Sequence, residues 1–532
     1  MFLPYYDIYN YPVVPPVRGR TLLLLGVSKL GPVNIPIPCA NKTVAKRIFG
    51  DSELYKAFCR AYEVDTNITI YLMRVSGEHA SSSLWADDMK GGSPVEAITL
   101  RSISGGEVFN DIQVTFSTIP DGNGGFPTAL TFFFPPEANT PMRSYIVSEY
   151  ETCNDLVRAI NEDTRAGLNY VVASTRYKQY PATSIPGWNM DAIFTGGEDG
   201  DDIDKNALYL ALEYSYSLLE GYYIDYVCPV GARFDDVHPA AYYGKAIYGT
   251  NIYEENRDYL SLQDSTKNNR LVSYQGQLIE FCKKQENLGC MTHGILGLNR
   301  VKDVTDLTKH EYSYIIRLLE ASGFKNRYDL AEFRSGEWYD QGYYVSIVAG
   351  EKYYDVDTEN KYHENLAVTY AAMLADLDPF GTTTNKTIPG TEELRYQFTA
   401  NELRELADMG IVAPRESVRH GFVIANGVTA SMPETEMHSV ANVRQVQLTL
   451  SFLNEALDEY IGTPIRPLME SRTLEDVIEN VLNSLKQDGI LIDYNYNLEY
   501  DESRGIGIVT VDLQAKRMVE RVTASSLLSF SA

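Results

Sequence analysis

The sequence predicts a multidomain protein of mixed α+β and α/β class, with extended arms at both ends. The chain has 532 residues, of which 44% are hydrophobic and 11% aromatic, so it is long enough for several packed cores. Residues 94–183 read as a series of short strands, whereas residues 191–389 alternate between strand and helix patterns. The first 20 residues are rich in proline and tyrosine, which favours an extended arm.

The expected elements begin directly after this arm. The run RTLLLLGVS from Arg20 predicts a buried strand, because it is apolar and too short for a helix. A Gly-Pro turn, two helices at about 42–49 and 52–61, and the strand NITIYLMRVS complete a first segment, 21–90. The runs AITLRSIS, DIQVTFSTI and ALTFFFP, separated by GG and DGNGG, predict a β-rich domain at 91–185.

An α/β domain is expected at 186–389. Its strand candidates are YIDYVCPVG, GCMTHGILGL and YYVSIVAG, and segments with helical apolar spacing lie between them. Such alternation is typical of a sheet layered with helices. Residues 390–520 follow with a helix, a hairpin, two helices and a strand pair, and residues 521–532 form a C-terminal arm.

The stretch RHGFVIANGVTAS at 419–431 reads as a β-hairpin. Two short apolar runs flank Asn426-Gly427, the pair that best tolerates the positive φ angles of a tight type I′ turn. A second antiparallel pair is expected from GILIDYNYNLEY and GIGIVTVDLQAK, joined by DESR, with Ile506, Ile508 and Thr510 on one face. Two strands alone are marginally stable and have open edges, so this pair needs partner strands.

The helix between these two pairs has an apolar stripe at intervals of three or four residues, which we interpret as core packing. Its opposite side carries Gln445, Gln447, Asn454 and Asp458. The stripe consists of Val443, Val446, Leu450, Leu453, Leu457 and Ile461.

The charge balance excludes several classes of partner. With 46 Lys and Arg against 72 Asp and Glu, the net charge is −26, which repels nucleic acid and anionic membranes. No run approaches the roughly 20 apolar residues of a spanning helix, and the start lacks the features of a signal peptide, so we expect synthesis in the cytoplasm. Six cysteines without a C-x-x-C pair favour buried free thiols over zinc ligands or disulfides.

Motifs of catalysis and cofactor binding are missing from the sequence. It contains no P-loop, H-E-x-x-H or G-x-S-x-G signature, and its seven histidines are dispersed. The acidic stretch GGEDGDDIDKN at 196–206 lacks the glycine that a calcium-binding EF-hand loop requires, so we interpret it as a solvated loop. The sequence therefore predicts no enzymatic activity, no cofactor and no metal.

Motifs spread over nearly the whole chain resemble, in their order, the sheath protein of contractile phage tails and phage-tail-like bacteriocins. A strand, a Gly-Pro turn and a helix ending in Phe-Gly open the compact part, and a "GVT" segment precedes a helix with arginine. Together the motifs follow one another in the same order as in the family. The matching positions are Gly26, Gly31-Pro32, Phe49-Gly50, Asp378, Gly381, Gly390, Gly427-Val428-Thr429 and Arg444.

The resemblance implies a structural role. It implies a subunit of a virion tail sheath that assembles in the host cytoplasm as stacked rings in a helical lattice around a tail tube. Contraction of this lattice drives the tube through the envelope of a target cell. The implied partners are other copies of the chain, the tube protein, and baseplate and tail terminator proteins. The implied architecture is an inner domain from 21–90 and 390–520, with the domains at 91–185 and 186–389 inserted and facing outward.

The resemblance also implies two sets of contact residues. Sheath proteins donate terminal strands to their neighbours, which here implicates Tyr5, Ile8, Tyr11, Ile506, Ile508, Thr510, Val522 and Leu527. The helix after the predicted hairpin would face the tube with Arg444, Gln447, Asn454 and Asp458.

Two alternatives stay open at this point. One is another structural protein of a phage or a surface layer, and the other is a cytoplasmic α/β enzyme with an acidic site. The arm-like termini and the missing catalytic motifs favour a structural protein over the enzyme.

Overall fold

A computed structural model describes most of the chain. Within the described residues no helix is long and apolar enough to cross a membrane. The chain divides into two compact units, the first within Leu24–Cys59 and Ile70–Ser215, the second within Pro16–Leu23, Arg60–Thr69 and Tyr216–Ala532. The described residues are 20–87, 91–118, 128–134, 143–162, 171–185, 192–203, 205–233, 274–298, 342–355, 361–378, 381–431, 433, 435–501 and 506–515.

The largest sheet has seven strands in the order β16-β13-β12-β11-β1-β3-β2, and the division between the units runs through β1 and β3. Strands β11, β12, β13 and β16 pair in parallel, whereas β2 and β3 pair antiparallel. Every residue of β1, β11, β12 and β13 is buried, as expected for parallel strands that are covered on both faces. The strands are β1 (Thr21–Gly26), β2 (Ile37–Pro38), β3 (Thr69–Arg74), β11 (Tyr226–Pro229), β12 (His293–Gly297), β13 (Val345–Val348) and β16 (Ile411–Val412).

Helices with clear end signals accompany this sheet. In α1, the Asn41 side chain accepts a hydrogen bond from the Val44 N–H at 2.9 Å, and Gly50 ends the helix with a φ of 67°. Nearly every residue of α10 is buried, which explains its apolar sequence AVTYAAMLAD. The helices are α1 (Lys42–Phe49), α2 (Glu53–Val64), α4 (Lys205–Leu218), α7 (Tyr274–Asn287), α10 (Ala367–Asp376) and α11 (Ala400–Asp408).

The first unit contains a β-rich region with two antiparallel sheets, in the orders β4-β5-β9 and β10-β6-β7-β8. Both sheets and the helix α3 (Cys153–Asn161) contribute to one buried core, and Thr152 and Asp155 form a capping box at the start of α3. The strands are β4 (His79–Ala86), β5 (Val95–Gly105), β6 (Gln113–Thr118), β7 (Thr128–Phe133), β8 (Arg143–Ile146), β9 (Val171–Ser174) and β10 (Ala192–Ile193); the short 3₁₀ turns are η1 (Glu107–Asp111), η2 (Val147–Glu149) and η4 (Ala182–Ser184).

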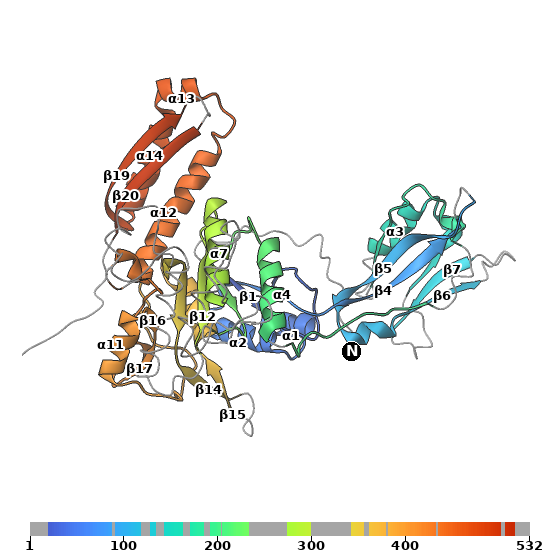
Figure 1. The fold of residues 1–532 in the computed structure, drawn as a ribbon, viewed down its shortest axis with the longest axis horizontal. Helices are drawn as coiled ribbons and strands as arrows, with labels where there is room; N and C mark the ends of the chain where they lie inside the picture. Colours follow the sequence, from blue (N-terminus) through green and yellow to red (C-terminus); the bar gives the residue numbers. More distant parts are fainter. Residues whose placement is uncertain are drawn as a thin grey trace, which may run out of the picture. The chain divides into compact units, whose positions relative to one another are not determined.

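Among its described residues the second unit carries three separate two-stranded sheets, and three helices lie toward its C-terminal end, of which α12 and α14 are the longest of the unit (Figure 1). The helices are α12 (Val440–Asp458), α13 (Ile465–Ser471) and α14 (Thr473–Gln487), and the 3₁₀ turns are η6 (Gly342–Tyr344) and η7 (Glu436–His438). The strand pairs are β14 (Glu351–Asp355) with β15 (Lys361–Asn365), β17 (Pro414–Ser417) with β18 (Gly421–Ile424), and β19 (Leu491–Asp501) with β20 (Ile506–Ala515).

The predicted hairpin around Asn426-Gly427 is wrong. Strand β18 pairs with the preceding strand β17 through the loop 418–420, and Gly421 takes the positive φ of 66°. The segment after β18 is instead tied to other elements: the Gly427 N–H donates to Thr384 Oγ1 at 2.9 Å, and the Ala430 N–H donates to the Val345 carbonyl. A turn signal in the sequence did not reveal these distant partners.

The grouping of the strands also differs from the predicted domains. Strands β11, β12 and β13 come from the predicted domain 186–389, but they lie in the same sheet as β1 and β16, which come from the predicted inner domain. Hydrogen bonds between neighbouring strands join the two segments. The β-rich region of the first unit contains strands within 91–185 and also β4 and β10, which lie outside that range. That these regions are inserted and face outward stays a prediction.

The predicted stripe of α12 is confirmed only in part. Val443 and Leu453 are buried, whereas Ile461 lies beyond the end of the helix and is 79% exposed. All six cysteines are buried free thiols, as predicted, and burial raises the pKa of Cys228 to about 12.

The acidic loop at 196–203 is more than a solvated loop. Its backbone carbonyls at Glu198 and Asp199 accept hydrogen bonds from the buried guanidinium of Arg74 in β3. The Asp199 carboxylate accepts from the Glu107 N–H at 2.8 Å, and Asp201 pairs with Lys29 at 3.4 Å. In the described part of the chain, no group of three or more His, Cys, Asp or Glu side chains is placed to hold a metal ion.

Candidate intersubunit interface

The β19–β20 hairpin confirms the predicted antiparallel strand pair. Tyr496 lies opposite Val511, and Glu499 lies opposite Ile508. Among the described residues this sheet has only these two strands, of eleven and ten residues, so each has one long edge without a neighbour. Unpaired N–H and C=O groups along such an edge are a template for strands of another chain.

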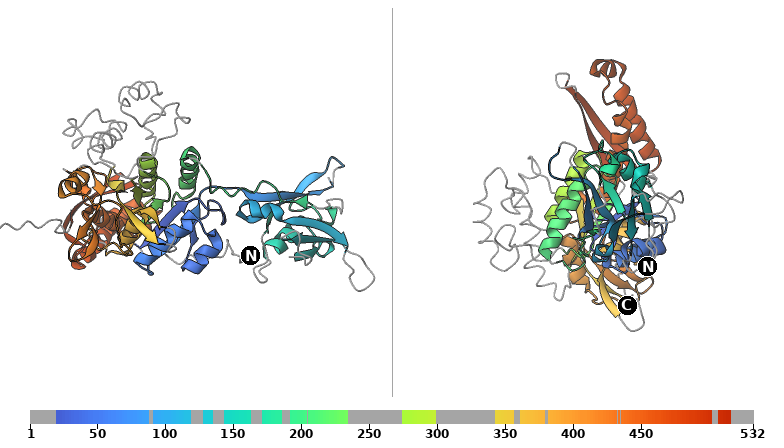
Figure 2. Two further views of the ribbon diagram at one scale, coloured as in Figure 1. Left: turned by 90° about the horizontal axis from the view of Figure 1, so that it is seen from below. Right: turned by 90° about the vertical axis from the view of Figure 1, so that its right-hand side faces the viewer.

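One face of the hairpin is covered by helices of its own unit. Figures 1 and 2 show β19 and β20 running alongside α14. Side chains from alternate strand positions pack on buried residues of α12 and α14, which gives the hairpin a small apolar core. The strand residues are Tyr494, Tyr496, Leu498, Val509, Val511 and Leu513, and the helix residues are Leu453, Ile478, Leu482 and Leu485.

Three tyrosines of β19 connect the hairpin to polar side chains of α14. Tyr494 and Tyr496 are two residues apart on the strand, an advance of about 6.6 Å, and their partners Asn483 and Glu479 are four residues apart on the helix, an advance of about 6 Å. The similar spacing lets both hydrogen bonds form side by side. Partial burial and the Glu479 carboxylate raise the pKa of Tyr496 to about 12, so its hydroxyl stays protonated as a donor. The bonds are Tyr494 to Asn483 at 2.9 Å, Tyr496 to Glu479 at 2.9 Å and Tyr500 to Glu475 at 3.2 Å.

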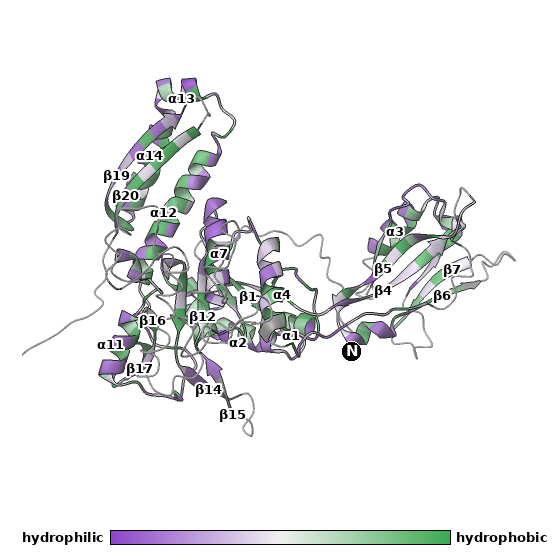
Figure 3. Ribbon diagram, in the orientation of Figure 1, coloured by the Kyte–Doolittle hydropathy of each residue, from purple (hydrophilic) through white to green (hydrophobic). Residues whose placement is uncertain are grey.

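The other face of the hairpin is exposed. Ile508 and Ile506 are 51% and 44% exposed, and Figure 3 shows hydrophilic and hydrophobic residues alternating along these strands. The predicted common face of Ile506, Ile508 and Thr510 is therefore this outer face. The predicted donor residues Tyr5, Ile8, Tyr11, Val522 and Leu527 lie outside the described residues.

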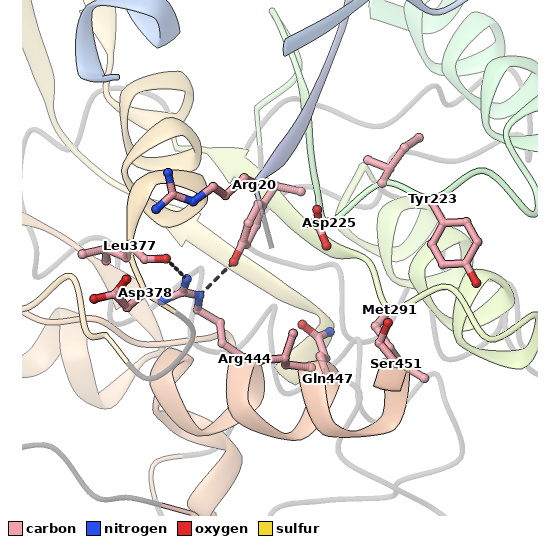
Figure 4. Close-up of a pocket in the computed structure, with 12 residues that line it drawn as sticks. Arg20, Tyr223, Asp225, Met291, Leu377, Asp378, Arg444, Gln447 and Ser451 are labelled. Carbon is pink, nitrogen blue, oxygen red and sulfur yellow. Dashed lines mark hydrogen bonds between the residues drawn. The ribbon is translucent and has the colours of Figure 1, made fainter. Parts of the chain in front are cut away.

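Arg444, which we predicted on a tube-facing surface, is buried inside the second unit. Its side chain is 4% exposed and donates to the Tyr226 hydroxyl at 2.8 Å and to the Leu377 carbonyl at 2.8 Å (Figure 4). Further bonds reach the carbonyls of Leu374 and Gly381. Arg444 therefore ties α12 to the loop after α10.

The other predicted tube-facing residues occupy different surroundings. Gln447 lines the same polar cavity as Arg444, of about 80 Å³, and donates to the Thr292 carbonyl at 3.4 Å. Asn454 lies close to Gly289: a Cβ atom added to Gly289 would be 3.5 Å from the side-chain amide nitrogen of Asn454. Asp458 is exposed at the end of α12. The structure therefore does not gather these four residues into one surface.

The tyrosine contacts with α14 were missed in the sequence. Their signal was present, because tyrosines at alternate strand positions 494 and 496 match polar residues four apart, 483 and 479, in the preceding helix. Reading that signal required knowing that the helix packs on the strand.

Comparison with known proteins gives a likeness in fold. No family model matches the sequence, and no curated protein matches it. A sheath tail protein from Listeria innocua superimposes with a TM-score of 0.52 at 12% identity, covering 94% of this chain and 92% of that chain. A sheath tail protein from Desulfitobacterium hafniense gives a TM-score of 0.46 at 11% identity, covering 95% and 99%. The first likeness confirms the predicted fold class: this chain has the fold of a tail sheath protein.

Proposed function

We propose that this chain is the structural subunit of a contractile tail sheath. It assembles as stacked rings in a helical lattice around a tail tube and contracts to drive the tube through the envelope of a target cell. The observation that carries this proposal is the β19–β20 hairpin, whose two long edges have no neighbouring strand among the described residues, in a chain with the fold of a tail sheath protein. The role is mechanical and needs no catalytic group.

Strand donation connects the subunits in this proposal. Residues 5–11 and 522–530 supply strands to the open edges of hairpins on neighbouring copies, and Pro12, Pro15 and Pro16 form a linker, since proline cannot donate to a strand ladder. Each backbone hydrogen bond contributes about 0.5–1.5 kcal/mol, and a donated strand forms several of them. The strand mesh then persists while other contacts rearrange during contraction.

The work of contraction comes from assembly. Subunits that assemble around the tube are held in a trapped state, and contraction releases them into a lattice with more extensive contacts. On α12 the exposed Asp458 is the best placed of the predicted tube-facing residues, whereas Arg444 is an internal anchor. The further partners are the tube, baseplate and terminator proteins of a virion or virion-like particle.

Assembly of the purified chain tests this proposal. Negative-stain microscopy is expected to show helical tubes of the wild-type protein. Deletion of residues 1–11, or Ile508→Pro in the acceptor hairpin, is expected to leave a folded monomer that forms no tubes. Thr510→Ala, on the same strand, is the control and should assemble. If either disrupting variant still forms sheaths that contract on tube-bearing particles, the strand-donation proposal is wrong.

A further inference from the structure

The loop between β17 and β18 presents an unusual surface for so acidic a chain. Ser417 pairs with Gly421, so the three residues between them form the tip of the hairpin. Val418 is fully exposed there, and Arg419 and His420 beside it are exposed as well. The strand pairing on both sides of the tip leaves the Val418 side chain in solvent.

Two further cationic side chains lie behind the tip, toward the base of this hairpin. The Arg415 guanidinium donates to the Asn385 side chain, which places it on the segment that lies beside β18. Lys386 follows in that segment and is exposed. The nearby acidic side chain, Glu416, accepts a hydrogen bond from Gln397 Nε2 at 2.9 Å. Within a chain of net charge −26, this tip combines one exposed apolar side chain, Val418, with the adjacent cationic side chain of Arg419.

The outer face of the β19–β20 hairpin has the opposite character. Ile508 lies opposite Glu499, and Ile506 lies opposite Asp501, so each exposed isoleucine has a carboxylate beside it. None of the ten outward-facing residues is Lys or Arg. They are Asp493, Asn495, Asn497, Glu499, Asp501, Ile506, Ile508, Thr510, Asp512 and Gln514.

The negative charge of this face is not uniform. At the base of the hairpin, Asp493 is paired with Lys486 of α14 at 2.8 Å. At the far end, Glu499 carries its charge next to Ile508 and accepts a hydrogen bond from the neutral Asn497 amide at 2.9 Å. The apolar and acidic features therefore coincide around Ile506 and Ile508.

We propose that the β17–β18 tip of one copy docks on the Ile506–Ile508 end of the outer hairpin face of a second copy. Val418 would rest on the isoleucines, with Arg419 beside Glu499, so that charge and apolar surface match together. Within the second unit the two hairpins lie far apart in Figure 1, so the contact joins different copies. Such a contact between two different patches propagates into open helical assemblies. This inference deepens the proposed sheath function, and it uses the face of the hairpin, leaving the edges to donated strands.

Cysteine cross-linking tests this contact directly. All six native cysteines are buried, so an introduced surface thiol reacts without competition from them. Val418→Cys chains mixed with Ile508→Cys chains and oxidised with diamide should form a disulfide-linked dimer at least tenfold faster than Val418→Cys chains mixed with Ile461→Cys chains. Ile461 is a matched control because it is apolar, highly exposed and in the same unit. Equal rates in the two mixtures would overturn the proposal.

Charge exchange provides a second test. Arg419→Glu should raise the protein concentration needed for assembly by about tenfold, and combining it with Glu499→Arg should reverse most of that increase. Arg404→Glu, which makes the same change at an exposed site on α11, is the control. An Arg419→Glu chain that assembles like this control would contradict the inference while leaving the sheath proposal intact. If the wild type formed no tubes, the sheath proposal would fail, and cross-linking would still decide the docking contact.

Discussion

Two antiparallel regions of this molecule differ in how completely they are closed. In the β-rich region of the first unit, residues from both sheets and from α3 share one buried core. In the β19–β20 hairpin, one face packs on α12 and α14, and the other face and both long edges are open among the described residues. The first region buries its core within one unit, whereas the described part of the hairpin region leaves one face and two edges uncovered. In the proposed sheath, strands of other chains complete the hairpin.

This difference indicates which region would contribute to contacts between subunits and which to the stability of the monomer. A closed region contributes its stability to the monomer and gives little to its neighbours. In the proposed strand exchange, the hairpin contributes its unpaired backbone groups and its exposed face to contacts between subunits. We therefore expect mutations in the first region to lower monomer stability and mutations on the outer hairpin to lower assembly.

The largest expected effect is at Arg74. Its guanidinium is buried in the first unit and donates to carbonyls that include Ser76 at 2.6 Å and Gly105 at 2.7 Å, and burial lowers its pKa to about 10, so it remains charged. Arg74→Met leaves these carbonyls without donors, and we expect the free energy of unfolding to fall by about 3–5 kcal/mol in urea titrations.

Arg101→Met is the control for this prediction. Arg101 is exposed on β5 of the same unit, and its replacement should change stability by less than about 0.5 kcal/mol. Equal effects of the two substitutions would show that the buried guanidinium does not hold the region together.

The next effect separates the two faces of the hairpin. Ile478 of α14 is fully buried under the hairpin, so Ile478→Ala should lower the free energy of unfolding by about 2–4 kcal/mol. Ile508→Ala removes a comparable side chain from the open face and should change the monomer by less than about 0.5 kcal/mol, while weakening assembly. Denaturant titration and sedimentation of both variants measure the contrast. A strongly destabilised Ile508→Ala monomer would mean that the outer face is already packed.

How far the sequence predicted this structure depended on the range of the interactions. The strand pair at the C-terminal end was predicted because apolar and polar residues alternate and the connection is short. The buried position of Arg444 was not predicted, because the carbonyl groups that it binds, at Leu374 and Gly381, lie more than 60 residues away in the sequence. The prediction of a turn at Asn426-Gly427 was wrong for the same reason, because Thr384 and Val345, which are distant in the sequence, accept hydrogen bonds from that segment.

The smallest expected effect is a pH dependence of the β-rich region of the first unit. At the start of β4, His79 makes a 2.8 Å hydrogen bond from Nδ1 to the Ser102 carbonyl, and Nε2 accepts from the Val33 N–H at 3.3 Å, an arrangement that suits the neutral ring. Burial first, and then the charge of Arg101, lower its pKa from 6.5 to about 4. The unfolded chain therefore binds a proton between pH 6.5 and pH 4 that the folded chain does not bind.

The sign of this effect follows from that difference in proton binding. Stability is fully present above pH 6.5 and falls as the pH drops toward 4, by at most about 1.4 kcal/mol per pH unit and by less where His79 is partly solvated. The variant His79→Gln should flatten this slope, as urea titrations of the two proteins between pH 7 and pH 5 would measure. An unchanged slope in His79→Gln would place the pH sensitivity at another group, such as the buried His293 of β12, whose pKa burial lowers to about 3.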